Sequence, residues 1–137
     1  MPQGWGGMVV KPMIAVVDDD LAMREMLEGM LTDADYDVQC WPSGLAAFDD
    51  LVHQQPALII LDLALGDDKE AGWQILTLLR AEARTVLIPV ILLSANEEFL
   101  TRREHILRTK KHARVLAKPF DLDALLELIA VLLRGAS

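Results

Sequence analysis

The chain has 137 residues, 53% of them hydrophobic and 25% charged, and its formal net charge is −8. This length suits one domain with a sizeable core, and the acidic balance argues against nucleic-acid binding by that domain. The single cysteine, Cys40, excludes an internal disulfide and fits a reducing compartment. The sequence has no apolar run long enough to span a membrane and no signal-peptide pattern, so a cytoplasmic location is expected.

Short apolar runs alternate with segments of helical periodicity from residue 13 onward. The runs suit strands buried on both faces, and the periodic segments suit amphipathic helices. The predicted elements are a strand at 13–17, a helix at 20–34, a strand at 36–41, a helix at about 43–55, a strand at 57–61, a helix at 72–84, a strand at 88–93, a helix at about 97–110, a strand at 113–117 and a helix at 121–135. This alternation predicts an α/β fold with a parallel sheet and helices on both faces, but it does not give the strand order.

Local signals support two of the helices. Asp20 and Asp121 stand where side chains cap helix N-termini, and Gly135 lies just beyond the expected end of the last helix. The first helix should bury one face made of Met23, Met26, Leu27, Met30 and Leu31. Residues 1–11 are expected to be a flexible leader, and residues 12–134 one domain.

Polar residues follow the strong strands at the edge where α/β sheets bind ligands. Asp18 and Asp19 follow the first strand, Asp62 ends the third, and Ser94 and Lys118 follow the fourth and fifth. Each alone has an ordinary explanation, since an Asp after a strand is usually a turn former or a cap. Together they would place three carboxylates, a hydroxyl and an ammonium on one edge.

Such a group of carboxylates favours a cation. Two like charges ~4 Å apart repel by roughly 4 kcal/mol at an effective dielectric constant of 20. Oxygen ligands without neighbouring Cys or His favour Mg²⁺ over zinc or iron. A magnesium ion, an ammonium and a hydroxyl together suit a phosphoryl group, because the cations offset its charge and the hydroxyl donates to an oxygen.

With these residues in order, the sequence resembles the receiver domain of two-component response regulators. The matching segments are VVDDD (16–20), LIILDLAL (58–65), PVILLSA (89–95) and VLAKPF (115–120), and the resemblance spans about residues 12–134. It implies a flavodoxin-like, doubly wound five-stranded parallel sheet in the order 2-1-3-4-5, with helices on both faces. Since Ser137 lies just past the last expected helix of this fold, we expect no output domain in this chain.

The resemblance implies a role for each site residue. Asp62 aligns with the phosphoacceptor, a carboxylate nucleophile that takes a phosphoryl group from a sensor histidine kinase or a phosphotransfer protein. Ser94 aligns with the hydroxyl that binds the phosphoryl group, and Lys118 with the lysine that pairs with the acceptor. Lys118 would precede Pro119 through a cis peptide bond. The implied Mg²⁺ ligands are Asp18, Asp19, Asp62 and the main-chain carbonyl of Ala64.

Two departures from the family pattern stand out. The loop Gly66–Ala71 is about two residues longer than usual and has Gly66 where the family usually has proline. The acidic residues of this loop have two interpretations: they form a solvated, variable surface, or one of them alters metal affinity or kinase docking. Val115 takes the position where the family commonly has a switch aromatic, so output should depend on helix and loop repositioning.

The remaining polar features are less specific. Six basic residues lie within 102–114, so the 97–118 face is either a site for a downstream protein partner or a solvated surface. Asn96 is expected to have a modest effect on the lifetime of the aspartyl phosphate. The histidines show no ligand spacing, and Trp41 and Trp73 are expected to pack.

Two other functions stay open at this point. A phosphorylation-independent pseudo-receiver, acting only as a protein-interaction module, would need the same fold. A flavodoxin-like cofactor or nucleotide binder would need a glycine-rich phosphate loop after the first strand, and none is present in the sequence.

Overall fold

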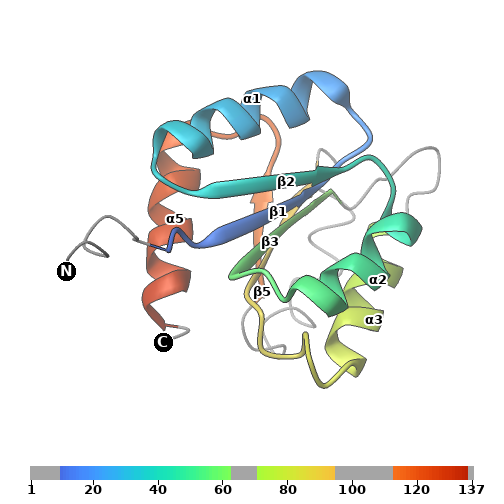
Figure 1. Ribbon diagram of the computed structural model, residues 1–137. Helices are drawn as coiled ribbons and strands as arrows, with labels where there is room; N and C mark the ends of the chain where they lie inside the picture. Colours follow the sequence, from blue (N-terminus) through green and yellow to red (C-terminus); the bar gives the residue numbers. More distant parts are fainter. Residues whose placement is uncertain (1–9, 63–70, 95–112, 136–137) are drawn as a thin grey trace.

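A five-stranded parallel sheet lies between two layers of helices (Figure 1). The computed structural model describes residues 10–62, 71–94 and 113–135. The strands are β1 (Met13–Val17), β2 (Asp37–Trp41), β3 (Leu58–Asp62), β4 (Val90–Ser94) and β5 (Ala113–Ala117). The described helices are α1 (Leu21–Asp33), α2 (Gly44–Gln54), α3 (Ala71–Ala81) and α5 (Leu122–Gly135). The strand order is β2-β1-β3-β4-β5, which confirms the doubly wound fold expected from the sequence.

Each central strand supplies side chains to two separate cores. In β1, Ala15 and Val17 face one core while Ile14 and Val16 face the other, because successive side chains point to opposite faces. The first core is covered by α2 and α3, and the second by α1 and α5, on opposite faces of the sheet in Figure 1. Both faces of β3 and β4 are therefore buried, which explains their continuous apolar sequences.

The start of α1 agrees with the sequence, but one residue of its predicted buried face does not. The Asp20 carboxylate accepts from the backbone N–H groups of Ala22 and Met23, as expected of an N-cap. Leu27 and Leu31 are fully buried. Met26, predicted to be buried with them, is 39% exposed. Each helical residue turns about 100°, so Met26 lies at the margin of the stripe centred on Leu27.

The connection from α3 to β4 shifts two predicted boundaries. The predicted helix at 72–84 ends at Ala81, because the buried Thr85 hydroxyl donates to the carbonyl of Leu79 at 2.7 Å and closes the helix end. The predicted strand at 88–93 begins at Val90 instead. Ile88 donates its N–H to Thr85 in a turn, and Pro89 has no N–H to donate.

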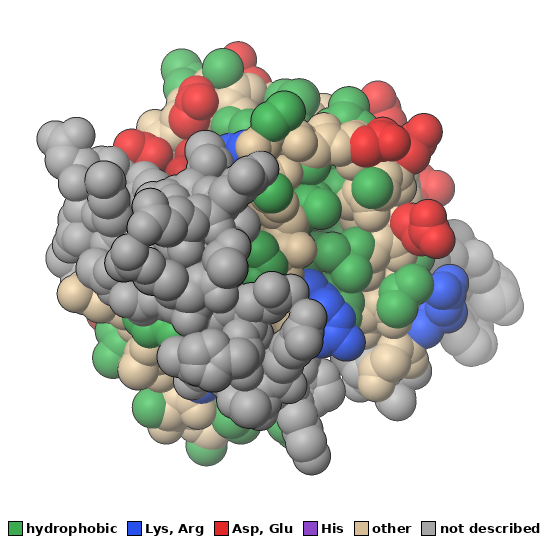
Figure 2. All heavy atoms as spheres, turned by 180° about the vertical axis from the view of Figure 1, so that it is seen from behind, with side chains coloured by type: hydrophobic (Ala, Val, Ile, Leu, Met, Phe, Trp, Pro, Cys, Tyr) green, Lys and Arg blue, Asp and Glu red, His purple; other side chains and the backbone are tan. Residues whose placement is uncertain are grey.

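The final helix has its cap where the sequence predicted it. The Asp121 carboxylate accepts the N–H of Asp123 at 3.0 Å. Gly135, predicted to lie just beyond the end of this helix, is instead the last residue of α5. Figure 2 shows the molecule from behind Figure 1, with apolar side chains at the centre of the described surface and acidic ones along its upper rim. On α5, Leu122 and Val131 are 39% and 47% exposed. Among the described residues, no helix combines the length and apolar character needed to cross a membrane.

Candidate functional site

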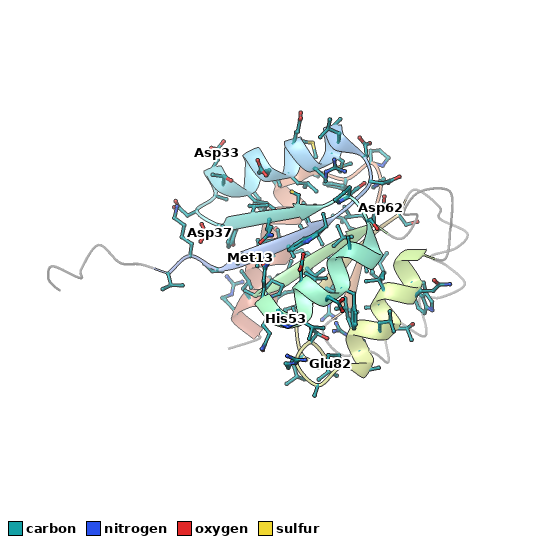
Figure 3. The ribbon with its side chains drawn as sticks, turned by 45° about the vertical axis from the view of Figure 1, so that its right-hand side comes forward. Met13, Asp33, Asp37, His53, Asp62 and Glu82 are labelled. Carbon is teal, nitrogen blue, oxygen red and sulfur yellow. The ribbon has the colours of Figure 1, made fainter. Side chains whose placement is uncertain are left out.

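The carboxyl ends of four strands bring the predicted polar residues to one edge of the sheet. Asp18 follows β1, Asp62 and Ser94 are the last residues of β3 and β4, and Lys118 follows β5. In Figure 3, Asp62 lies at this edge, and Met13, the first residue of β1, lies toward the opposite one. The register of the parallel strands places these ends side by side, since Asp62 pairs with Leu93 and Ser94 with Ala117.

Three carboxylates gather at this edge. Asp18, Asp19 and Asp62 each contribute one oxygen to a group whose members all lie within 4.8 Å of one another. Asp18 and Asp62 are almost completely buried, at 1% and 5% exposure, whereas Asp19 is exposed. The group therefore opens to solvent on the Asp19 side.

Among the described residues, Lys118 places its ammonium beside these carboxylates. Its Nζ lies 3.4 Å from Oδ2 of Asp62 and 3.7 Å from Oδ2 of Asp18. Its backbone N–H donates to the carbonyl of Ser94 at 2.8 Å, which fixes the start of this segment beside β4. The peptide bond between Lys118 and Pro119 is cis, as the resemblance implied.

The main chain and carboxylate of Asp18 are held by three hydrogen bonds. Its N–H donates to the carbonyl of Trp41 at 3.1 Å, and its Oδ1 accepts the N–H of Asp20 at 2.9 Å. Its own carbonyl accepts from Nη1 of Arg24 at 2.8 Å. The second carboxylate oxygen, Oδ2, is buried and has no hydrogen-bond partner.

The environment of Asp18 disfavours its charged form. Burial raises the pKa of Asp18 from 3.8 to about 6, and the neighbouring Asp62 acts in the same direction. The N–H of Asp20 and the charge of Lys118 oppose this increase in the pKa. One nearby ammonium is thus insufficient compensation for the buried carboxylates.

These ligands fit a hard divalent cation. The group offers only carboxylate oxygens, and the buried Oδ2 of Asp18 lacks a hydrogen-bond donor. A divalent ion would supply the missing positive charge, and all-oxygen sites favour Mg²⁺ or Ca²⁺ over softer metals. Asp18, Asp19 and Asp62 are therefore the described residues that could hold it.

Several predicted features lie outside the described residues. These are Ala64, residues 66–70 of the acidic loop, Asn96 and most of the 97–118 face. Of the described residues, Ser94 is 2% exposed at the end of β4. Val115 is half-buried against the core beneath α2 and α3. Trp41 is buried in the same core and Trp73 is partly buried against it, so both tryptophans pack as expected.

Two contacts near the site were not predicted from the sequence: that of Arg24 with Asp18 and that of Trp41 with Asp50. The indole Nε1 of Trp41 donates to the Asp50 carboxylate at 2.9 Å, linking the end of β2 to α2. Arg24 lies six residues after Asp18, and an arginine in the second turn of a helix is usually a surface residue. A faint signal exists for Arg24, because it follows the cap residue Asp20 by four positions and so lies on the same helix face.

Comparison with known proteins gives one consistent family. The family profile described as response regulator receiver domain matches residues 14–130. The chain is 34% identical to the DNA-binding dual master transcriptional regulator RpaA of Synechocystis sp. over 123 residues, which are 90% of this chain and 49% of that protein. It is also 34% identical to the response regulator Rre1 of the same organism over 121 residues, 88% of this chain and 51% of that protein. The chain thus spans about half the length of these curated relatives.

Solved structures share the fold. The signal receiver domain of a protein described as a Luxo repressor, from Vibrio parahaemolyticus, superposes with a TM-score of 0.79 at 25% identity and covers 93% of each chain. The chemotaxis response regulator CheY4 of Vibrio cholerae superposes with a TM-score of 0.77 over 90% of this chain and 99% of that one. At 20% identity, the second likeness concerns the fold alone.

Proposed function

This chain belongs to the response regulator receiver domain family, and from that membership we propose that it is a Mg²⁺-dependent phosphoacceptor whose nucleophile is Asp62. The donor is a histidine kinase or a phosphotransfer protein, and the reaction switches binding to a downstream protein in the cytoplasm. The observation that carries the proposal is the carboxylate group of Asp18, Asp19 and Asp62 with the Lys118 ammonium 3.4 Å from Asp62.

The proposed metal ligands are the three carboxylates and the main-chain carbonyl of Ala64. The buried Oδ2 of Asp18 supports this role, because it has no hydrogen-bond partner. The Lys118 ammonium, 3.7 Å away, leaves the pKa of Asp18 raised, so a second cation would lower the cost of burying this carboxylate. Bound Mg²⁺ would offset negative charge on the oxygens of the transferred phosphoryl group.

In the proposed reaction, a carboxylate oxygen of Asp62 attacks the phosphorus atom of a phosphohistidine. A P–O bond to Asp62 forms as the P–N bond breaks, and the departing imidazole keeps the electron pair and takes up a proton from solvent. Water later hydrolyses the acyl phosphate and regenerates the carboxylate. The chain thus catalyses its own phosphorylation and dephosphorylation and is a signalling domain, not an enzyme acting on a separate metabolite.

Lys118 and Ser94 have separate roles in this reaction. Lys118 lies within ion-pair distance of Asp62 before transfer and is well placed to follow the charge onto the phosphoryl group. Ser94, at the neighbouring strand end, would donate its hydroxyl proton to a phosphoryl oxygen. Because Val115 cannot act as an aromatic switch, the signal would leave through movement of the segments around Ser94 and Lys118.

The test is phosphoryl uptake from a small donor such as acetyl phosphate with Mg²⁺, read by intact mass. We expect the wild type to gain one phosphoryl group, with no gain after Mg²⁺ chelation. Asp62→Asn removes the nucleophile at nearly constant shape and should abolish the gain. The matched control is Asp49→Asn on the exposed surface of α2, which should react like the wild type.

The linkage formed in the reaction separates the alternatives. An acyl phosphate on Asp62 is cleaved by neutral hydroxylamine, whereas a phosphate ester on a hydroxyl such as that of Ser94 survives. A wild-type protein that binds Mg²⁺ but gains no phosphoryl group from any small donor or kinase would be a pseudo-receiver. Equal uptake by Asp62→Asn would refute the assignment of the nucleophile.

A further inference from the structure

Arg24 reaches back from α1 to the peptide group that joins two of the clustered acidic residues. Its Nη1 donates to the carbonyl oxygen of Asp18 at 2.8 Å, and its side chain is half-buried. That carbonyl belongs to the peptide plane between Asp18 and Asp19. Fixing the carbonyl therefore fixes the direction in which the main chain enters Asp19.

Arg24 differs from the other groups that hold Asp18. Trp41 and Asp20 contact it through main-chain atoms, and these contacts restrain the N–H and the Oδ1 of Asp18. Neither bond acts on the Asp18 carbonyl, which Arg24 binds from the far side of the first helical turn. Without the guanidinium, this peptide plane would have fewer restraints, and the exposed Asp19 carboxylate would follow its rotation.

We propose that Arg24 is a positioning residue for the divalent cation site, because its bond to the Asp18 carbonyl aligns the Asp18 and Asp19 carboxylates. This inference rests on the proposed function, in which those carboxylates hold Mg²⁺. Groups that orient metal ligands commonly contribute tenfold or more to metal affinity.

Because Arg24 is positively charged, its two possible effects on Mg²⁺ affinity have opposite directions. A guanidinium near a cation site repels the incoming cation, so loss of charge alone would make Mg²⁺ bind more tightly. Loss of ligand alignment would make it bind more weakly. The direction of the change in Mg²⁺ affinity therefore distinguishes positioning from a general electrostatic effect.

The experiment measures Mg²⁺ affinity by isothermal titration calorimetry on the whole chain, at pH 8 and moderate ionic strength. Arg24→Met should raise the dissociation constant about tenfold. Arg24→Lys should recover part of the loss, because it keeps a donor on a side chain one atom shorter. The matched control is Arg114→Met, since Arg114 also donates Nη1 to a main-chain carbonyl, that of Ala113 at 2.9 Å, but at the opposite ends of the strands. Its Mg²⁺ affinity should equal that of the wild type.

A kinetic measurement adds a second readout. With a small phosphodonor, Arg24→Met should need about tenfold more Mg²⁺ for half-maximal rate and should approach the wild-type rate at saturation. A lower thermal unfolding midpoint with an unchanged Mg²⁺ dissociation constant would indicate a merely structural residue and overturn the proposal. Unchanged or tighter Mg²⁺ binding by Arg24→Met would overturn it as well.

Two further outcomes keep the test decisive. If Arg24→Met does not fold, Arg24→Gln is titrated instead, because its shorter side chain remains polar but does not reach the carbonyl; an unchanged affinity there overturns the proposal. If the wild type itself binds no Mg²⁺, the cation site of the proposed function fails, and the role of Arg24 fails with it. If the wild type binds Mg²⁺ and the Arg24 variants bind it equally well, only the role of Arg24 is refuted.

Discussion

The two ends of the parallel strands differ in what they bury. At the carboxyl ends, Asp18 and Asp62 are buried beside the ammonium of Lys118. At the amino ends, the surface forms an open hollow of about 690 Å³. Its lining is mainly apolar: Pro12, Gln55, Ala57, Ala83, Arg84, Leu87, Ile88, Pro89 and Leu133.

The two ends of the strands also differ in their main-chain hydrogen bonds. At the amino ends, Asp37 donates to Pro12, Ala57 to Met13 and Ile59 to Pro89, at 2.8 to 3.0 Å. These bonds connect the strand starts without burying charge. The carboxyl ends instead hold carboxylates whose burial and mutual repulsion oppose folding in their charged form. One end of the sheet thus stabilises the fold, while the other retains the unfavourable charge of the proposed phosphoacceptor site.

The largest expected effect of a substitution on stability lies at the stabilising end. Leu58, the first residue of β3, is fully buried in the core beneath α1 and α5. Leu58→Ala removes buried methyl groups and leaves a cavity, so we expect a loss of about 3 kcal/mol in the free energy of unfolding by urea. Mg²⁺ affinity of the folded protein should stay unchanged. A large change in that affinity would show that the two ends of the strands are energetically coupled.

The pH dependence of stability should come from the carboxyl ends of the strands, where Asp18 is buried. Because the pKa of Asp18 rises from 3.8 to about 6 on folding, the folded protein binds this proton more tightly than the unfolded chain does. Stability without metal should therefore fall as pH rises from about 4 to 6 and then level off, by at most about 3 kcal/mol. Urea unfolding across this pH range, with a chelator present, measures the effect.

Asp18→Asn is the control for this pH dependence. The variant lacks the titrating carboxylate, so the difference between its stability and that of the wild type should grow from pH 4 to 6. Above pH 6 without metal, we expect Asp18→Asn to be the more stable protein by about 1–2 kcal/mol. Saturating Mg²⁺ should reverse this order. A constant difference at all pH values would contradict the assigned cause.

The sequence predicted most of the fold because its signals were local and repeated. Continuous apolar runs identified β3 and β4, and the side chain of Asp20 marked the start of α1. The errors occurred where a single contact decides the outcome. The hydroxyl of Thr85 ends α3 at Ala81, and no periodicity reveals that bond.

The site was predictable for a different reason. In a parallel sheet, residues that follow the strands converge on one edge, so Asp18, Asp62 and Lys118 could be grouped without knowing their side-chain geometry. The burial of Asp18 and its raised pKa depend on the packing of neighbouring elements. Arg24 was missed because its contact joins a helix side chain to a main-chain carbonyl, and its spacing of four residues from Asp20 is too common in helices to identify such a contact.

The smallest predicted effect tests the stabilising end with a single hydrogen bond. Thr85 is fully buried, and its hydroxyl donates to Leu79 at 2.7 Å. Thr85→Val preserves the shape but leaves a buried carbonyl without this donor, so we expect a loss of about 1 kcal/mol in the free energy of unfolding. The matched control is Thr77→Val, since Thr77 donates to Trp73 at 3.0 Å on the exposed face of α3. There, water can replace the lost donor, and the change should stay below about 0.5 kcal/mol. Equal losses in the two variants would mean that burial does not determine how much the Thr85 hydrogen bond contributes to the free energy of unfolding. The hydrogen bond at the amino ends of the strands would then stabilise the protein no more than one on an exposed helix face.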